Sequence, residues 1–234
     1  MSEEVTPVTR GTGVVALVPM RHHSERVPGK NYRMVAGRPL YAHILETLLS
    51  CPEITQTVVD TDSPVIREGV ERQFPAVRLI ERAEHLRGGE VPTNDVIDFD
   101  IRAVPARFYL QTHSTNPLLR PETVSQAIRA FLDGCPAHDS LFSVTRLQKR
   151  LWDGEGLPVN HDPAVLLRTQ DLPPLYEENS CIYLFERGVF LERHNRLGKR
   201  PMMFEVPADE AWDLDEESDL RIVESLLTLR RAER

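Results

Sequence analysis

Positive charge gathers in the loop of residues 19–31, although the chain of 234 residues carries a net charge of −8. Arg21, Arg26 and Lys30 stand in this basic loop against a single acidic residue. Guanidinium and ammonium groups bind polyphosphates when they stand beside a hydroxyl, such as that of Ser24, and free loop amides. The basic loop therefore predicts a phosphate site, with a solvated loop that binds nothing as the alternative.

Two common phosphate-binding motifs do not fit the basic loop. A Walker A motif needs glycine at position 24 and serine or threonine at position 31, where this chain has Ser24 and Asn31. No Gly-x-Gly-x-x-Gly pattern follows the first apolar run either. The basic loop is therefore a different kind of phosphate site.

A second candidate for chemistry is the acidic motif Asp213-Leu214-Asp215. In an extended chain, residues two apart point to the same side, so both carboxylates can meet one hard cation. The alternative is that Asp215 caps the helix that follows, while Asp213 faces solvent. Taken together, the basic loop and the two carboxylates favour a triphosphate ligand. Basic side chains would hold it on one side and Mg²⁺ on the other.

The elements that must position these residues are indicated by alternating apolar patterns. Strands are predicted over residues 14–18, 57–59, 77–80, 108–111, 141–144, 181–185 and 203–206, and helices over 40–49, from 64 onward, over 94–104, over 121–132 and after 215. This alternation predicts an α/β fold with a mostly parallel sheet flanked by helices. In such sheets ligands bind beyond the carboxyl ends of the strands, and the basic loop directly follows the first strand.

Residue types at the helix ends predict how some of these helices begin. Pro64 places proline in the first turn of its helix, and Thr93 or Asn94 can cap the helix over 94–104. Asp215 can cap the last helix, which is the alternative to its role as a metal ligand. The apolar face predicted for that helix consists of Leu220, Ile222, Val223 and Leu226.

The periodic pattern weakens over residues 145–176, which are rich in proline, aspartate and glycine. This stretch is either a flexible excursion or an ordered arm that packs on a neighbouring subunit. We expect a single domain over residues 13–230, with the arm at about 144–179, after a disordered or flexible segment at residues 1–12.

Composition narrows the class of protein and its partners. A chain of this length with 41% hydrophobic residues builds one sizeable core. The acidic balance opposes general binding to nucleic acid or anionic membranes, and no apolar run approaches the ~20 residues that span a bilayer. Three widely spaced cysteines fit reduced thiols, and without a signal-peptide pattern the chain is predicted to be cytoplasmic. We expect neither nucleic acid nor a membrane as a partner.

The basic loop resembles the signature of sugar-activating cytidylyltransferases, with Arg21, Ser24, Lys30 and Asn31 on its key positions. The best match is the acylneuraminate (CMP-sialic acid synthetase) branch. Roughly residues 14–227 are covered in the right order, which is far more than one short motif gives by chance. The resemblance continues at Gly37-Arg38-Pro39-Leu40, Thr61-Asp62, Arg82-Ala83-Glu84-His85-Leu86, Leu110-Gln111, Asn116-Pro117-Leu118, Asn179-Ser180-Cys181-Ile182-Tyr183 and Asp213-Leu214-Asp215.

The sequence departs from the family pattern at three places, and one of them, residues 111–118, concerns the sugar. Glu25 stands where lysine is usual, and Arg26 follows, in a Ser-x-Arg-x-Pro-Gly-Lys run that resembles the related deoxy-octulosonate (KDO) enzymes. Residues 111–118 replace a Gln-Pro-Thr-Ser-Pro-Leu segment that lines the sugar pocket in the sialic acid enzymes. Asn179-Ser180 stands where Asn-Gly is usual. The identity of the sugar therefore stays open.

The resemblance implies a Rossmann-like nucleotide-diphospho-sugar transferase fold and a homodimer whose irregular dimerisation arms reach across to the partner. The implied activity is Mg²⁺-dependent transfer of CMP from CTP to the anomeric hydroxyl of a sialic-acid-like 2-keto sugar acid, with release of pyrophosphate.

The same resemblance implies roles for individual residues. Arg21, Lys30 and Asp215 are the predicted catalytic residues, and Asp213 and Asp215 the predicted Mg²⁺ ligands. Predicted nucleotide contacts are Arg21, Ser24, Arg26, Lys30, Asn31 and Arg82, and predicted sugar contacts are Gln111, Asn116, Arg168 and Gln170. For the general base, a metal-bound hydroxide, Asp213 or Asp215, and a residue of the partner's arm remain alternatives.

Other functions remain open at this point. The same chemistry can act on KDO, legionaminate, pseudaminate or a keto-deoxy nonulosonate. A nucleotidyltransferase that uses a sugar 1-phosphate is a different reaction class. A non-catalytic nucleotide-binding relative is the third alternative, although the intact charged residues count against it.

Overall fold

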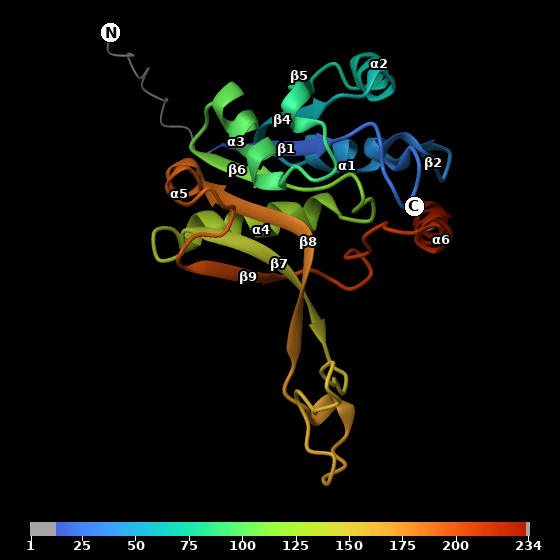
Figure 1. Cartoon of the computed structure of the whole chain (residues 1–234), viewed down its shortest axis with the longest axis vertical. Helices are drawn as coiled ribbons and strands as arrows, with labels where there is room; N and C mark the ends of the chain where they lie inside the picture. The colour runs from blue at the N-terminus through green and yellow to red at the C-terminus, as the bar shows by residue number, and fades with distance from the viewer. Residues whose placement is uncertain (1–12, 233–234) are drawn as a thin grey trace.

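A sheet lies at the centre of the molecule (Figure 1), and its strands form where the sequence has apolar runs. Its strands are β1 (Val14–Met20), β4 (Ile54–Thr61), β5 (Arg78–Glu81), β6 (Phe108–Gln111), β7 (Ser140–Leu147), β8 (Leu175–Glu186) and β9 (Pro201–Glu205). The computed structural model describes residues 13–232, so the predicted flexible segment 1–12 lies outside the described residues.

The strands lie in the order β5-β4-β1-β6-β8-β7-β9. β1 pairs in parallel with β4 and β6, β4 with β5, and β7 with β9, whereas β8 runs antiparallel to both of its neighbours. The predicted mostly parallel sheet flanked by helices is therefore confirmed.

Helices connect the strands and cover both faces of the sheet (Figure 1). They are α1 (Leu40–Leu49), α2 (Pro64–Gln73), α3 (Thr93–Ala103), α4 (Pro121–Gly134), α5 (Arg187–Arg193) and α6 (Glu217–Ala232). Short 3-10 turns η1 (Lys30–Tyr32), η2 (Glu84–Leu86) and η3 (Thr169–Asp171) and a small hairpin, β2 (Met34–Val35) with β3 (Arg38–Pro39), complete the chain. Among residues 13–232, no helix combines the length and apolar character that a membrane crossing needs.

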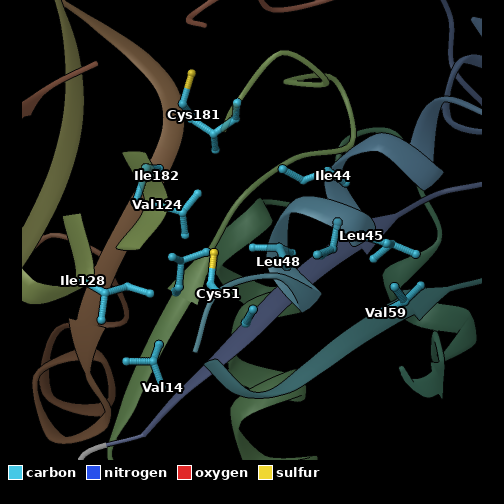
Figure 2. Packing of buried hydrophobic residues seen from close by; sticks show 14 of the residues in the cluster. Val14, Ile44, Leu45, Leu48, Cys51, Val59, Val124, Ile128, Cys181 and Ile182 are labelled. Atoms are coloured by element: carbon cyan, nitrogen blue, oxygen red, sulfur yellow. The ribbon is translucent and has the colours of Figure 1, made fainter. Parts of the chain in front are cut away.

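The core divides into two layers because successive residues of β1 point to opposite faces of the sheet. Val14, Ala16 and Val18 pack with α1, α2 and α4, whereas Val15 and Leu17 pack with α3 and α5. Figure 2 shows part of the first layer, where Leu48 of α1 and Val124 of α4 lie near Cys51. Burying both faces explains why the strand appears in the sequence as a continuous apolar run.

The predicted helix starts are only partly right. Pro64 stands in the first turn of α2, and the Ser63 hydroxyl caps it by accepting from the backbone amide of Ile66 at 3.3 Å. α3 begins after Pro92 without a side-chain cap bond, so the prediction that Thr93 or Asn94 caps it is wrong.

The apolar face of α6 also differs from the prediction. On α6 the buried residues are Leu220, Val223 and Leu227, whereas Ile222 is 38% exposed and does not belong to the apolar face.

The start of α4 is completed by a residue distant in sequence. The carboxylate of Glu210, which is 2% exposed, accepts from the backbone amide of Arg120 at 2.8 Å and from the hydroxyl of Thr123 at 3.0 Å. It satisfies an amide that the helix itself leaves without a partner. This contact fixes the chain just before the acidic motif to the body of the fold.

The arm is built by the outer ends of β7 and β8, which extend beyond the sheet (Figure 1). Their pairing continues from Val144↔Glu178 to Leu147↔Leu175 after a shift in register between Phe142 and Val144. Residues 148–174 then form an excursion that contains η3 and an isolated bridge between Trp152 and Pro158. The irregular arm expected at about 144–179 is therefore a paired ribbon at its two ends, where the sequence shows no apolar alternation because a ribbon outside the core needs none.

Candidate active site

A cavity of about 570 Å³ lies beyond the carboxyl ends of the parallel strands. Residues that directly follow β1, β5 and β6 line it, as expected for a ligand site in an open α/β sheet. The cavity brings together the basic loop, Arg82 and the acidic motif, although these are distant in sequence. The predicted site residues along its wall are Arg21, Ser24, Arg26, Lys30, Asn31, Arg82, Asp213 and Asp215.

The basic loop owes its path to one buried apolar residue and one glycine. Val27 is fully buried in an apolar cluster with Leu214 and Val223. Gly29 has a positive φ of 67°, and a Cβ there would lie 2.8 Å from the ring of Tyr32. Only glycine therefore fits the turn that starts η1 at Lys30.

Asn31 ties the basic loop to the segment that follows β6. Its Nδ2 donates to the carbonyl oxygen of Arg21 at 2.7 Å, and its Oδ1 accepts from the hydroxyl of Ser114 at 2.7 Å. Asn31 is 8% exposed, so both bonds are shielded from water. The amide fixes the shape of the loop, and a nucleotide contact by Asn31 stays a prediction.

The basic loop and the acidic motif meet at Asp215. Arg26 forms an ion pair with its Oδ1 at 2.7 Å, and Lys30 Nζ lies 3.2 Å from the same oxygen. Lys30 Nζ also donates to the carbonyl oxygen of Leu214 at 2.8 Å. The basic loop and the acidic motif, which the sequence analysis treated as separate candidates, thus belong to one site.

Asp215 does not act as the helix cap. The carboxylate of Asp219 accepts instead, from the backbone amide of Asp215 at 2.9 Å and from that of Glu216 at 2.7 Å. This leaves the Asp215 carboxylate free to face the cavity and its cations.

The two aspartates of the acidic motif differ in their electrostatic surroundings. Burial raises the pKa of Asp213; a hydrogen bond with Thr115 lowers it, and the neighbouring Asp215 raises it further. Burial also opposes ionisation of Asp215, but Lys30 and then Arg26 outweigh it and hold its pKa below the usual range. Lys30 and Arg26 lower the pKa of Asp213 only in part, so Asp213 is the carboxylate whose charge is incompletely compensated.

The acidic motif fits a Mg²⁺ ion. Asp213 Oδ1 is buried and receives no donor from the described residues. A dication beside Asp213 and Asp215 would neutralise the charge that burial disfavours. Residues 13–232 hold no group of three or more histidine, cysteine, aspartate or glutamate side chains that could hold a metal. A pair of carboxylates is nonetheless what Mg²⁺ commonly takes when substrate phosphates and water complete its shell.

The predicted sugar contacts do not line this cavity. Gln111 is fully buried, its Nε2 donates to the carbonyl oxygen of Thr112 at 2.9 Å, and its Oε1 accepts from Arg196. Asn116 is also fully buried, and its side-chain amide has no partner among the described residues. Arg168, which pairs with Asp171, and Gln170 lie exposed on the arm. The sugar-binding roles of these four residues stay predictions.

Sequence reasoning missed two features of the cavity wall. His113 lines the cavity, and burial, followed by the charges of Arg196 and Lys30, lowers its pKa to about 4, so it is neutral at pH 7. Gly89 also lines the cavity, and a Cβ there would lie 2.8 Å from Glu25 Oε1. Two consecutive glycines after η2 were the available signal for this close approach to the basic loop.

The chain matches the cytidylyltransferase family over residues 15–231. It is 28% identical to the CMP-N,N'-diacetyllegionaminic acid synthase of Legionella pneumophila, over 93% of this chain and 97% of that protein. It is also 28% identical to the 3-deoxy-manno-octulosonate cytidylyltransferase of Acaryochloris marina, over 80% and 79%. Identity to the N-acylneuraminate cytidylyltransferase A of Danio rerio is 25%, over 90% of this chain and 50% of the fish protein.

Solved structures confirm the predicted Rossmann-like fold. A CMP–2-keto-3-deoxy-manno-octonic acid synthetase, solved with CTP, has a TM-score of 0.73 at 19% identity, over 93% of this chain and 99% of that one. A 4-diphosphocytidyl-2C-methyl-D-erythritol synthase from Anaerococcus prevotii has a TM-score of 0.66 at 11% identity, over 93% and 97%.

Replacing Asn31 by alanine is expected to lower the free energy of unfolding by about 1–3 kcal/mol, because two shielded hydrogen bonds lose their partner. Urea unfolding measures the loss. In a double-mutant cycle with Ser114→Ala, the second substitution should cost less in the Asn31→Ala background than in the wild type. Additive losses would contradict the tie between the basic loop and the segment after β6.

Proposed function

The chain belongs to the cytidylyltransferase family, and from this premise we propose that it transfers CMP from CTP to the anomeric hydroxyl of a 2-keto sugar acid. One observation carries the proposal: the basic loop and the acidic motif meet across a single cavity, where Lys30 and Arg26 contact Asp215. In the reaction, the acceptor oxygen forms a bond to the α-phosphorus while the bond to the bridging oxygen breaks. Pyrophosphate leaves, and the hydroxyl proton passes to a base.

The cations of the basic loop would bind the triphosphate. Arg21, Arg26 and Lys30 line the cavity, and the latter two already balance a carboxylate that would share them with the phosphates. Fixed positive charges that need no reorganisation stabilise the charge that develops on the leaving pyrophosphate. Asp213 and Asp215 would hold Mg²⁺, which supplies further positive charge to the phosphate oxygens.

The acceptor is proposed to be an acid of the sialic acid kind, with KDO and legionaminate as alternatives. Three relatives are named for acids of these types: N-acylneuraminate, 3-deoxy-manno-octulosonate and N,N'-diacetyllegionaminic acid. They support a sugar acid as the acceptor class, without choosing among the three.

An unpaired cation near the cavity also supports an acidic acceptor. The half-buried guanidinium of Arg196 lies 3.9 Å from the centre of the Tyr183 ring and donates to Gln111. No carboxylate of residues 13–232 lies within ion-pair distance of it, and burial lowers its pKa, although the charges of Tyr183 and Glu178 oppose this effect. Gln111 Nε2 in turn lies 3.1 Å from Nε2 of His113, which lines the cavity. A carboxylate of the acceptor would supply the missing counter-charge.

Pyrophosphate release from CTP and Mg²⁺ tests the reaction, with N-acetylneuraminate, KDO, legionaminate, pseudaminate and a sugar 1-phosphate as separate acceptors. We expect release with one of the 2-keto acids. Asp215→Ala should lower kcat by about 100-fold or more, because the site loses a carboxylate that faces the phosphates. Glu216→Gln, one residue further along and outside the cavity wall, is the matched control and should keep wild-type turnover.

The same assay separates the alternatives. Release with the sugar 1-phosphate alone would replace the proposal by the other reaction class. If CTP binds but no acceptor releases pyrophosphate, the non-catalytic nucleotide-binding alternative gains support. Normal turnover of Asp215→Ala would remove this residue from the site.

Arg196→Gln is expected to raise KM for the sugar acid by about tenfold, since a charge-assisted hydrogen bond to its carboxylate is lost. KM for CTP should stay within about twofold, because Arg196 does not line the nucleotide cavity. Steady-state kinetics with each substrate varied in turn measure both constants. Arg196→Lys, which keeps the charge, should recover part of the effect, and equal losses for CTP and acceptor would contradict the assignment.

We also propose that the protein is a homodimer held together by its arms. Large apolar side chains lie exposed there, at Trp152, Leu157, Val159, Val165, Leu166 and Leu167. Leu166 is 88% exposed, and such a concentration of apolar surface favours an interface. In the dimer, Arg168 and Gln170 would contact the sugar in the partner's cavity.

The three cysteine thiols are free, and location in the cytoplasm stays a prediction.

Leu166→Asp is expected to weaken dimerisation, because a charge would be buried in the apolar contact between the arms. Sedimentation velocity should show a shift towards the monomer at micromolar concentration. Leu229→Asp, at a 61% exposed leucine on α6, is the control and should leave the dimer intact. A wild-type protein that sediments as a monomer would contradict the proposal.

A further inference from the structure

Two acidic side chains are buried together beneath the wall of the nucleotide cavity. Asp60 on β4 and Asp100 on α3 are each 1% exposed. Arg82, which follows β5 and lines the cavity, is 5% exposed and contacts the first of them. These three residues come from β4, from α3 and from the loop after β5, and the proposed reaction gives no role to either acid.

The hydrogen bonds of this buried group are incomplete as long as both acids are ionised. Arg82 donates from Nε to Asp60 Oδ1, and its Nη2 lies 3.4 Å from the carbonyl oxygen of Asp60. Asp60 Oδ2 and both carboxyl oxygens of Asp100 are buried and receive no donor from the described residues. An ionised carboxylate can only accept, so each of these oxygens would lose its hydration without a replacement.

A single proton shared by the two acids neutralises the surplus negative charge and supplies the missing hydrogen-bond donor. The carboxyl groups of Asp60 and Asp100 are close enough for a hydrogen bond between them. Two carboxylates beside one guanidinium leave a surplus negative charge, whereas a proton on one of them makes the group neutral. Since Arg82 is paired directly with Asp60, the proton belongs on Asp100, which then donates to Asp60.

The electrostatic surroundings favour that protonation. The charged groups that face the pair are Arg82 and, two residues beyond Asp60, the carboxylate of Asp62. Burial, followed by the charge of Asp60, raises the pKa of Asp100 to about 9. Burial also raises the pKa of Asp60, although Arg82 opposes it.

We propose that Asp100 is a positioning residue: it is a neutral carboxylic acid at physiological pH and, through Asp60, holds the Arg82 guanidinium in the wall of the nucleotide cavity. The part of this inference that concerns the nucleotide rests on the proposed function. The shared proton does not, since it follows from the buried contacts alone.

The shared proton has a measurable effect on stability. Between the ordinary pKa of aspartate and about 9, the folded protein holds a proton that the unfolded chain has released. The free energy of unfolding therefore falls as pH rises through this window. Asp100→Asn removes the titrating group and keeps a donor towards Asp60, so this contribution to the pH dependence should disappear.

Thermal unfolding from about pH 5 to about pH 9 tests the proton. The Tm of wild type should fall relative to that of Asp100→Asn as pH rises. Asp98→Asn, on the same helix but at a surface pair with Arg102, is the control and should follow wild type. Parallel curves for wild type and Asp100→Asn would overturn the proposal.

If Asp100→Asn does not fold, infrared spectra of the wild-type protein decide instead. A neutral carboxylic acid band at pH 7 that disappears above about pH 9 would support the shared proton, and the absence of this band at pH 7 would overturn it.

Calorimetric titration with CTP tests the positioning role. Wild-type affinity should fall as pH rises through about 9, whereas that of Asp100→Asn should stay constant. Asp100→Leu, which has no donor, should bind CTP about tenfold more weakly throughout the range. Equal affinities for all three proteins would overturn the positioning role. A wild type that binds no CTP at any pH would instead reject the proposed function, and the Tm comparison would still decide the shared proton.

Discussion

The site depends on the contact between Lys30 of the basic loop and the acidic motif. Lys30 is 184 residues from Leu214 and 185 residues from Asp215 in the sequence. Lys30 Nζ is hydrogen-bonded to the carbonyl oxygen of Leu214 and to the carboxylate of Asp215, and the lysine side chain is only 14% exposed. An ammonium group so far removed from water needs these partners. Lys30, Leu214 and Asp215 all lie outside the sheet, so their meeting requires a separate support.

That support is a small apolar cluster distinct from the two main layers. Val27 of the basic loop, Leu214 of the acidic motif and Val223 of α6 are all fully buried in it. Apolar contact thus brings the charged groups together, and the sheet supplies only the position of the loop after β1. In the proposed function, a triphosphate would meet cations that already balance the carboxylate of Asp215, beside Asp213, whose charge is only partly balanced.

Sequence patterns predicted the elements better than the contacts between them. The ranges Leu40–Leu49 and Phe108–Gln111 agree with the predicted helix and strand, because periodicity and apolar runs are local signals. The cap of α6 at Asp219 and the cap of α4 by Glu210 depend on which competing side chain reaches the amides in three dimensions. The same holds for the Asp60–Asp100 pair, since no spacing rule joins β4 to α3. Of the candidate site, the basic loop, Arg82 and the acidic motif could be predicted because they are contiguous motifs. Arg196 stood in no motif, and His113 stood in the segment 111–118 at a position that the family pattern gives no role.

The order of residues along the chain has a consequence for the protein during synthesis. A ribosome completes the basic loop early and reaches Leu214 and Asp215 only after every strand of the sheet has been made. Domains fold as their chains emerge, so the sheet can form while Lys30 and Arg26 still lack their carboxylate. Until residue 215 has emerged, the nascent chain therefore presents an uncompensated patch of positive charge to the anionic surface of the ribosome that makes it.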